Sequence, residues 1–239
     1  MSAIILPHYG LAAAQQPYIQ SDGNQYINTN YVINVNTIIT LHAKFMEFIE
    51  DNNRYLYGKS GSGMSGEESV SFHFRKSTDY SNNNQYYVYA GGYDGGNSLS
   101  VSDANDKSVT FEHKDVTCTV YTSAEPTSGN QYPESVMIIG SGGSEEYYYS
   151  RDANAAISRT PDHTLPLYLF ANNNAGTPSG HAKIKLYYFC ISERTETGIR
   201  RIKEYIPATD PSGTACLYDT VNRRYAYNEG TGQFICGVE

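Results

Sequence analysis

GTACLYDTVNRRYAYNEGTGQF, the stretch from Gly213 to Phe234, decides the fold. Successive residues of an extended strand point to opposite faces, so we expect Ala215 and Leu217 to face a core. The segment DTVNRR that follows is typical of a turn, and the chain then leads back through alternating tyrosines. Two strands joined by a short turn form a hairpin, and the sequence therefore predicts a closing β-hairpin near residue 239.

Charged residues gather at the turn of this hairpin. We expect Asp219 and either Arg223 or Arg224 to form an exposed ion pair there, worth less than ~1 kcal/mol. Beyond the hairpin, we expect either Phe234 or Ile235 to cap the core. The stretch thus indicates how a fold closes, and it gives no direct sign of a functional site.

Alternation of apolar and polar residues with a period of two continues along the chain, between breaks rich in Gly, Asn, Asp, Ser and Pro. This pattern predicts an all-β fold with two antiparallel sheets. TGIRRIKEYIP is compatible with either a helix or a strand. Several strands have a predicted inward face. Two examples are Ile39, Leu41, Ala43 and Phe45 in one strand, and Ala182, Ile184, Leu186, Tyr188 and Cys190 in another.

The length and the net charge of the chain limit the classes of function that it can have. The chain has 239 residues, of which 39% are hydrophobic, enough for one large core. With 17 Lys and Arg against 25 Asp and Glu, the net charge is −8, which argues against nucleic-acid binding. The 23 Tyr favour strands, whereas the 21 Gly favour turns.

The N-terminal residues 1–16 differ in composition from the rest, and we expect them to form an arm before a single sandwich domain at 17–239. The stretch lacks the positively charged start of a secretion signal, and Pro7 and His8 interrupt its apolar run. No segment reaches the ~18 apolar residues that a membrane span needs. We expect synthesis in a cytoplasm without export, no membrane insertion, and packing of the arm on another subunit.

The four cysteines show no C-x-x-C spacing, which argues against a zinc site. Cysteines in strands are most often buried free thiols. A bridge between Cys216 and Cys236 across the last hairpin stays open as an alternative.

Three blocks of the sequence resemble concanavalin A-like, laminin-G-like jelly-roll domains of gut bacteriophage and gut bacterial surface proteins. The first is YIQSDGNQYINTNYVINVNTIITLHAKF, from Tyr18 to Phe45. The second is PLYLFANNNAGTPSGHAKIKLYYFCI, from Pro166 to Ile191. The third is EYIPATDPSGTACLYD followed by the closing stretch. The resemblance implies a two-sheet jelly-roll sandwich with a concave face, in which the first strand pairs near the last.

Some enzymes of this fold are glucanases, whose carboxylates alternate along one strand. Retaining hydrolysis needs two carboxyl groups ~5 Å apart. The nearest candidates here are Glu47, Glu50 and Asp51, but residues 47 and 50 of a strand point to opposite faces. We therefore expect no enzymatic activity.

Tyrosines are the best candidates for ligand binding, since a tyrosine offers apolar area with a polar tip. Tyr147, Tyr148 and Tyr149 lie in SEEYYYSRD, and Tyr93 and Asp94 lie at the tip of a glycine-rich loop. We take these five as candidate ligand-binding residues, with outward strand or hairpin positions as the structural alternative.

No cofactor is predicted. Calcium is compatible with the fold, and SDANDKS offers Asp103, Asn105 and Asp106, but this segment lacks the glycine and distal glutamate of an EF-hand loop.

Two hypotheses about function follow. In the first, the protein is a non-enzymatic bacteriophage virion protein, a capsid decoration or fibre-type module that contacts other virion proteins through its arm. It would form homo-oligomers, and its sandwich would face outward and adhere to host or mucus glycans. In the second, the protein is an extracellular carbohydrate-binding or adhesion module of a gut bacterium, located at the cell surface.

Overall fold

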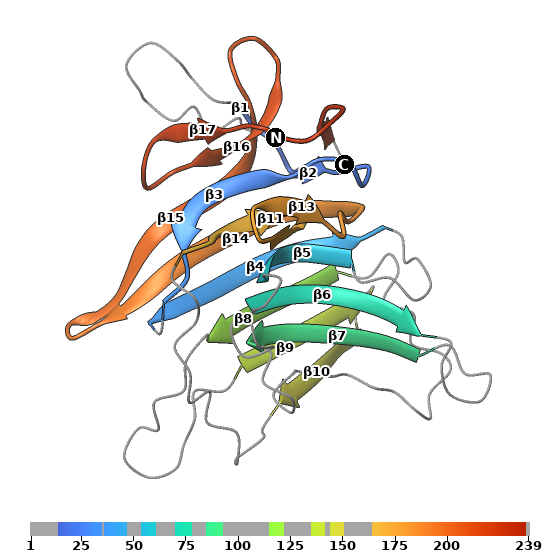
Figure 1. Cartoon of the computed structure of the whole chain (residues 1–239), viewed down its shortest axis with the longest axis vertical. Coiled ribbons are helices and arrows are strands. Elements are labelled where there is room, and N and C mark those ends of the chain that lie inside the picture. The colour runs from blue at the N-terminus through green and yellow to red at the C-terminus, as the bar shows by residue number, and fades with distance from the viewer. Residues whose placement is uncertain are drawn as a thin grey trace.

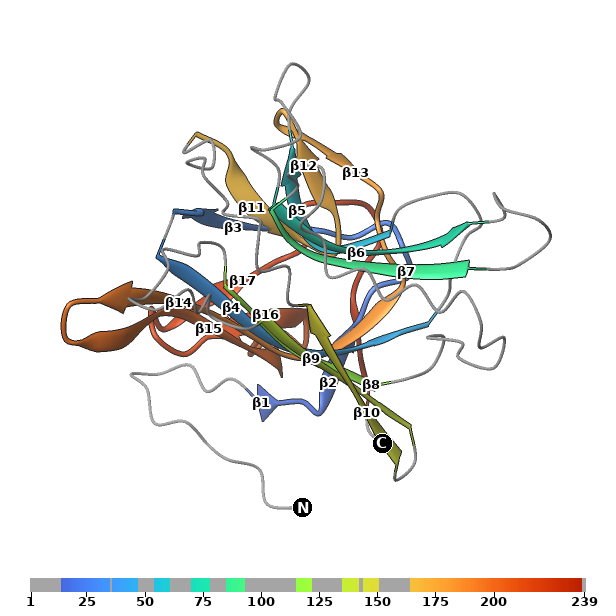
Figure 2. The same ribbon diagram turned by 90° about the horizontal axis from the view of Figure 1, so that it is seen from below.

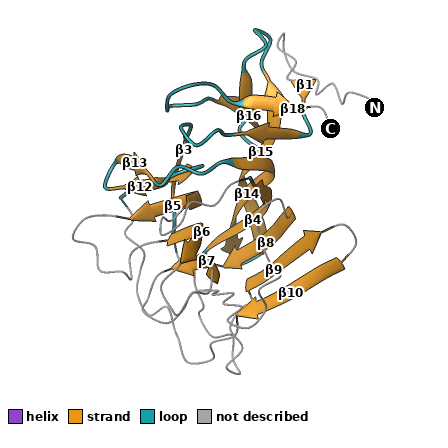
Figure 3. Cartoon of the chain, turned by 90° about the vertical axis from the view of Figure 1, so that its right-hand side faces the viewer, coloured by secondary structure: helices purple, strands orange, loops and turns teal. Residues whose placement is uncertain are grey.

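A computed structural model describes residues 14–34, 36–46, 54–60, 70–77, 85–92, 115–121, 135–141, 144–150 and 164–237. These residues form strands and turns, and no helix occurs among them (Figure 3). They build two curled sheets stacked face to face, an arrangement compatible with a β-sandwich (Figures 1 and 2). The predicted all-β class is therefore confirmed.

The larger sheet has 11 strands, and every pairing within it is antiparallel. Its main path runs through β10 (Ser144–Ser150), β9 (Ser135–Ser141), β8 (Asp115–Tyr121), β4 (Thr37–Phe45), β14 (Ile184–Thr195), β15 (Gly198–Thr209), β16 (Ala215–Asp219) and β17 (Arg224–Ala226). Three short strands join from the chain ends: β1 (Ala14–Gln15), β2 (Tyr18–Gln20) and β18 (Ile235–Gly237).

The smaller sheet has seven strands and is mixed, because β12 runs parallel to β5. Its path is β13 (Thr177–Ser179), β12 (Asn172–Asn174), β5 (Arg54–Ser60), β11 (Pro166–Leu169) and β3 (Ile27–Val32). Two further strands extend it from β5: β6 (Val70–Ser77) pairs with β5, and β7 (Gln85–Gly92) pairs with β6.

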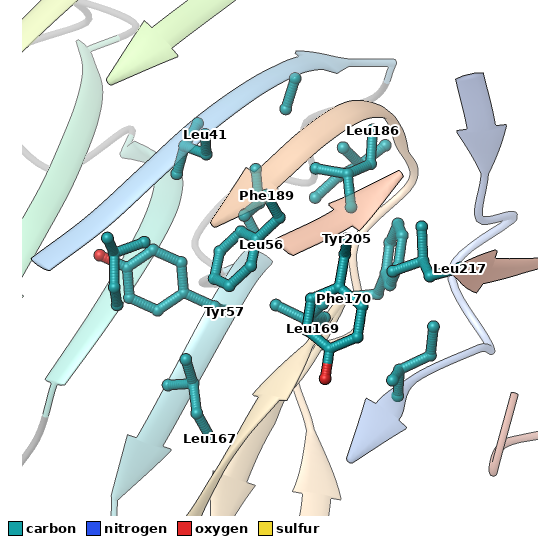
Figure 4. Close-up of a cluster of buried hydrophobic side chains, with 14 of the residues drawn as sticks. Leu41, Leu56, Tyr57, Leu167, Leu169, Phe170, Leu186, Phe189, Tyr205 and Leu217 are labelled. Atoms are coloured by element: carbon teal, nitrogen blue, oxygen red, sulfur yellow. The ribbon is translucent and has the colours of Figure 1, made fainter. Parts of the chain in front are cut away.

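The main core lies between the sheets and draws on both of them (Figure 4). Leu41 and Phe189 come from the larger sheet and Tyr57 and Leu169 from the smaller, and all four are fully buried. Burial of each such side chain contributes about 1.5–3 kcal/mol, and this apolar contact holds the layers together. In β4 the predicted inward residues Ile39, Leu41 and Ala43 are indeed buried.

The face predicted for the second half of β14 is wrong. Leu186 pairs with Ala43, but the next register partner of β4 is Tyr188 opposite His42, so one extra residue lies between them. This β-bulge shifts the alternation by one position. As a result Phe189 and Ile191 join the main core, whereas the sequence pattern predicted Tyr188 and Cys190 there.

The closing hairpin forms as predicted. Strands β16 and β17 are antiparallel around the turn at Thr220–Arg223, and Leu217 lies in the main core. Phe234 caps this core against Phe170 with ring centroids 4.9 Å apart, while Ile235 is 57% exposed.

The predicted exposed ion pair is also wrong. Asp219 is fully buried, and its carboxylate lies 3.8 Å from the ammonium of Lys203, which is itself 5% exposed. The backbone amides of Glu204, Val221 and Asn222 donate hydrogen bonds to the same carboxylate. Asp219 therefore organises the turn from inside the sandwich.

Cys190 and Cys216 are buried free thiols, as expected, and Cys236 is a half-buried free thiol. The alternative bridge between Cys216 and Cys236 is absent. Both thiols donate to the carbonyl of Ala208, at 3.6 and 3.4 Å, but Cys216 belongs to a small outer cluster and Cys236 packs against the main core. Burial raises the pKa of Cys216 to about 12 and that of Cys236 to about 11, so both stay protonated.

The N-terminal strands occupy a gap in the larger sheet. The segment TGIRRIKEYIP proves to be a strand, because all of it after Thr197 lies in β15. Strand β15 follows β14 as far as the pair Phe189 and Tyr205. Beyond that pair β2 takes the place of β15 beside β14, and β1 pairs with the diverging end of β15. Strand β18 pairs in turn with β2, so strands from the two ends of the described chain lie side by side.

Candidate functional site

A group of aromatic rings lies where the smaller sheet meets the closing loop. Tyr26 precedes β3, Tyr168 lies in β11 and His181 precedes β14. The rings of Tyr26 and Tyr168 have centroids 4.9 Å apart, and that of His181 lies 6.1 Å from Tyr26. We call these three residues the ring cluster.

Two charged residues flank the ring cluster. Arg54 at the start of β5 donates a hydrogen bond to the carbonyl oxygen of His181 at 3.1 Å. Glu229 is exposed, and its backbone amide donates to the carbonyl oxygen of Tyr26 at 2.9 Å. The cluster therefore has a guanidinium group, that of Arg54, and a carboxylate, that of Glu229, beside its rings.

The ring position of Tyr26 is fixed by the closing stretch. The side-chain oxygen of Asn228 accepts the amide of Tyr26 at 3.1 Å and that of Gly230 at 2.8 Å. Gly230 lies so close to the carbonyl of Asn24 that a methyl group on it would collide with that oxygen. The loop that presents Glu229 is thus packed tightly on the loop that presents Tyr26.

Tyr168 and His181 are held by the smaller sheet. Tyr168 is 7% exposed, pairs with Asn28 of β3 and donates a long hydrogen bond of 3.5 Å to the carbonyl of Gly176. His181 forms a bridge with Tyr55 of β5. These contacts give the cluster a rigid base, with Tyr26 as its more exposed ring.

The electrostatic environment keeps the rings uncharged. Burial, followed by the charge of Glu229, raises the pKa of Tyr26, while burial, Tyr26 and Glu229 raise that of Tyr168. Burial and then the charge of Arg54 lower the pKa of His181. At neutral pH the cluster therefore offers two phenols and a neutral imidazole between one guanidinium and one carboxylate.

Such a group suits a ligand with apolar faces and hydroxyl groups. An aromatic ring packs against C–H faces, while Arg54 can donate and Glu229 can accept hydrogen bonds. Small-molecule sites combine apolar area with a few fixed polar groups in this way.

The residues predicted as ligand-binding are not part of this group. Tyr147, Tyr148 and Tyr149 lie in β10, the last strand at one edge of the larger sheet, opposite Ile138, Met137 and Val136 of β9. Tyr93 and Asp94 lie outside the described residues, as do the candidate carboxylates Glu47, Glu50 and Asp51.

The candidate calcium ligands Asp103, Asn105 and Asp106 also lie outside the described residues. Within the described ranges, no group of three or more His, Cys, Asp or Glu residues is placed to hold a metal ion. That part of the chain also contains no helix long and apolar enough to cross a membrane.

Local sequence patterns could not have located the ring cluster, because Tyr26 and Glu229 come from opposite ends of the chain. The available signal was the pairing of first and last strands implied by the family resemblance, which brings these ends together. No protein-family model matches the sequence, and a search of curated proteins likewise finds no match.

Proposed function

We propose that this chain is a non-enzymatic adhesion module that binds glycans through the ring cluster. The observation that carries the proposal is the contact of the Tyr26 and Tyr168 rings, with Arg54 and Glu229 beside the ring cluster. It combines a ring for a sugar face with a donor and an acceptor for hydroxyl groups.

We further propose the jelly-roll topology of concanavalin A-like, laminin-G-like domains. The three resembling blocks supply β2 to β4, β11 to β14 and β15 to β17, which include the central strands of both sheets. The pairing of β2 with β18 supports this topology, because the resemblance implies that the first strand lies near the last.

The number of carboxylates beside the ring cluster favours glycan binding over glycan hydrolysis. Among the described residues, Glu229 is the one carboxylate that raises the pKa of Tyr26 and Tyr168. Glycoside hydrolysis ordinarily needs two carboxyl groups on either side of the scissile bond. A lone carboxylate beside stacked rings suits recognition of hydroxyl groups.

As the biological setting we propose a bacteriophage virion, with the sandwich outward and the N-terminal arm on other virion proteins. The resemblance to phage proteins supports this setting. The same chemistry would serve an adhesion module on a gut bacterium. Neighbouring capsid, portal or tail genes would favour the virion, and an upstream signal peptide would favour the bacterial surface.

The glycan proposal is tested on an array of mucin, plant and bacterial glycans. We expect the wild-type protein to bind a subset of neutral glycans, and Tyr26→Ala to weaken that binding tenfold or more, which corresponds to about 1.4 kcal/mol. Tyr227→Ala is the matched control, because Tyr227 is also exposed but contacts Tyr225 and Asp210 instead.

Running the array with and without a chelator tests the calcium hypothesis at the same time. Binding that disappears with the chelator would assign a metal to recognition. The proposed site would be contradicted if the wild-type protein bound no glycan on the array, or if Tyr26→Ala bound as tightly as the wild-type protein.

A further inference from the structure

A second aromatic group lies on the outer face of the larger sheet. Tyr187 of β14 stacks on His42 of β4 with ring centroids 4.4 Å apart and planes 21° apart. Tyr18 of β2 meets Tyr187 edge to face at 6.1 Å. All three side chains are partly exposed, and none of them belongs to the ring cluster.

The β14 bulge creates this group. Leu41 and Ala43 of β4 point into the core, so His42 between them points outward. Tyr187 is the extra residue between Leu186 and Tyr188, and its stacking on His42 places it on the same outer face. Bulges redirect side chains in this way and recur beside binding sites.

Two lysines complete the group. Lys185 of β14 lies directly opposite Lys44 of β4 in the register, and its ammonium sits 4.0 Å from the centroid of the Tyr18 ring. Asp115 of β8 occupies the register position on the other side of Lys44. The exposed Lys183 comes just before β14, so three lysines gather here on a chain whose net charge is −8.

The ring of Tyr18 is packed between two neighbouring residues. Gly237 of β18 lies against it so closely that any side chain at position 237 would collide with the ring. Lys185 covers the ring as a cation–π partner. Tyr18 and Lys185 therefore restrain each other before any ligand arrives, which lowers the entropy that binding must overcome.

We infer that this face, defined by Tyr18, His42, Lys44, Lys185 and Tyr187, is a second binding site, for a carboxylated polysaccharide. Lys44 and Lys185 lie on the same outer face, where their ammonium groups can donate hydrogen bonds to the carboxylates of a ligand. Tyr187 provides a surface for sugar C–H groups beside the ammonium groups. The inference rests on the proposed glycan binding for the class of ligand, but on different residues for the site.

The test uses three polymer probes: polygalacturonate, which carries carboxylates on sugars, neutral dextran, and polyglutamate, which carries carboxylates without sugars. We expect the wild-type protein to bind polygalacturonate more tightly than polyglutamate, and more weakly at 300 than at 50 mM salt, because salt screens exposed charges. The Lys44→Gln/Lys185→Gln variant should lose tenfold or more in affinity for polygalacturonate.

Arg223→Gln is the matched control, because it removes one exposed positive charge from the β16–β17 turn. It should change the affinity for polygalacturonate less than twofold. Lys185→Arg keeps the positive charge and should retain most of the wild-type affinity. Unchanged binding by the double lysine variant, or equal affinity of the wild-type protein for polyglutamate, would overturn the inference.

Tyr26→Ala separates this inference from the proposed function. It should weaken neutral-glycan binding on the array and leave polygalacturonate binding unchanged, whereas the lysine variant should do the reverse. Absence of neutral-glycan binding by the wild-type protein, or equal binding by Tyr26→Ala, contradicts the proposed function alone. Binding of polygalacturonate that does not depend on the two lysines contradicts this second site alone.

Discussion

At the scale of single residues, the buried charges of the closing hairpin have the largest expected effect. Asp219 and Lys203 are both excluded from water, and neutralising one of them leaves the other charge buried without its partner. Burial and the nearby charge of Arg224 lower the pKa of Lys203, while Asp219 opposes this shift. The pair therefore depends on both members.

Replacing Asp219 with alanine should destabilise the fold by about 3–5 kcal/mol. It leaves the Lys203 charge buried without its partner and removes the acceptor of two turn amides and one amide of β15. Urea denaturation at neutral pH measures the change. Arg223→Ala in the same exposed turn should stay within about 0.5 kcal/mol. A similar small effect for both variants would mean that Asp219 does not organise this hairpin.

The sequence could not reveal this pair. Periodicity places Asp219 on the inward face of β16, but charge normally marks solvated positions. Its partner Lys203 lies on the neighbouring strand and is likewise inward. Two inward charges on adjacent strands are recognised only when the register of those strands is known.

At the scale of strands, alternation predicted the regular parts and failed at the irregular one. It was correct for Ile39, Leu41 and Ala43 of β4, which are buried, and wrong for β14 beyond Leu186. A bulge adds one residue without any marker in composition, so a period of two cannot locate it. The same bulge brings Tyr187 to the outer face, so the sequence pattern could not predict the second proposed site either.

The closing loop is the element that supports the ring cluster. Gly230→Ala should destabilise the protein by about 1–3 kcal/mol and weaken neutral-glycan binding, because a methyl group there meets the backbone oxygen of Asn24. Thermal melting and the glycan array give the two readouts. Gly213→Ala is a useful comparison, since it has open space and a φ of 84°, and should cost only about 1 kcal/mol with no loss of binding. Normal glycan binding by Gly230→Ala would show that the loop does not position Glu229.

At the scale of the whole molecule, the last residues of the expected N-terminal arm already belong to the larger sheet. The expected arm covers residues 1–16, but Ala14 and Gln15 form β1, and the amide of Gln16 donates to the carbonyl of Pro207 at 2.9 Å. Deletions that test anchoring must therefore stop before Ala14.

Removing residues 1–13 should leave the melting temperature nearly unchanged and abolish incorporation into particles, because the paired strands stay intact. Removing residues 1–16 should also lower the melting temperature, since it deletes β1 from the edge of β15. Co-expression with the particle proteins and sedimentation of assembled particles measures incorporation. Full incorporation of the shorter deletion would contradict the anchoring role of the arm.

The meeting of β2 with β18 also sets the order in which the protein can be completed during synthesis. Ile19 is synthesised long before its partner Cys236, because the two residues are far apart along the chain. Contacts between such distant segments carry a high loop-closure entropy and slow folding. One edge of β2 therefore stays unpaired and prone to wrong partners until β18 has been synthesised.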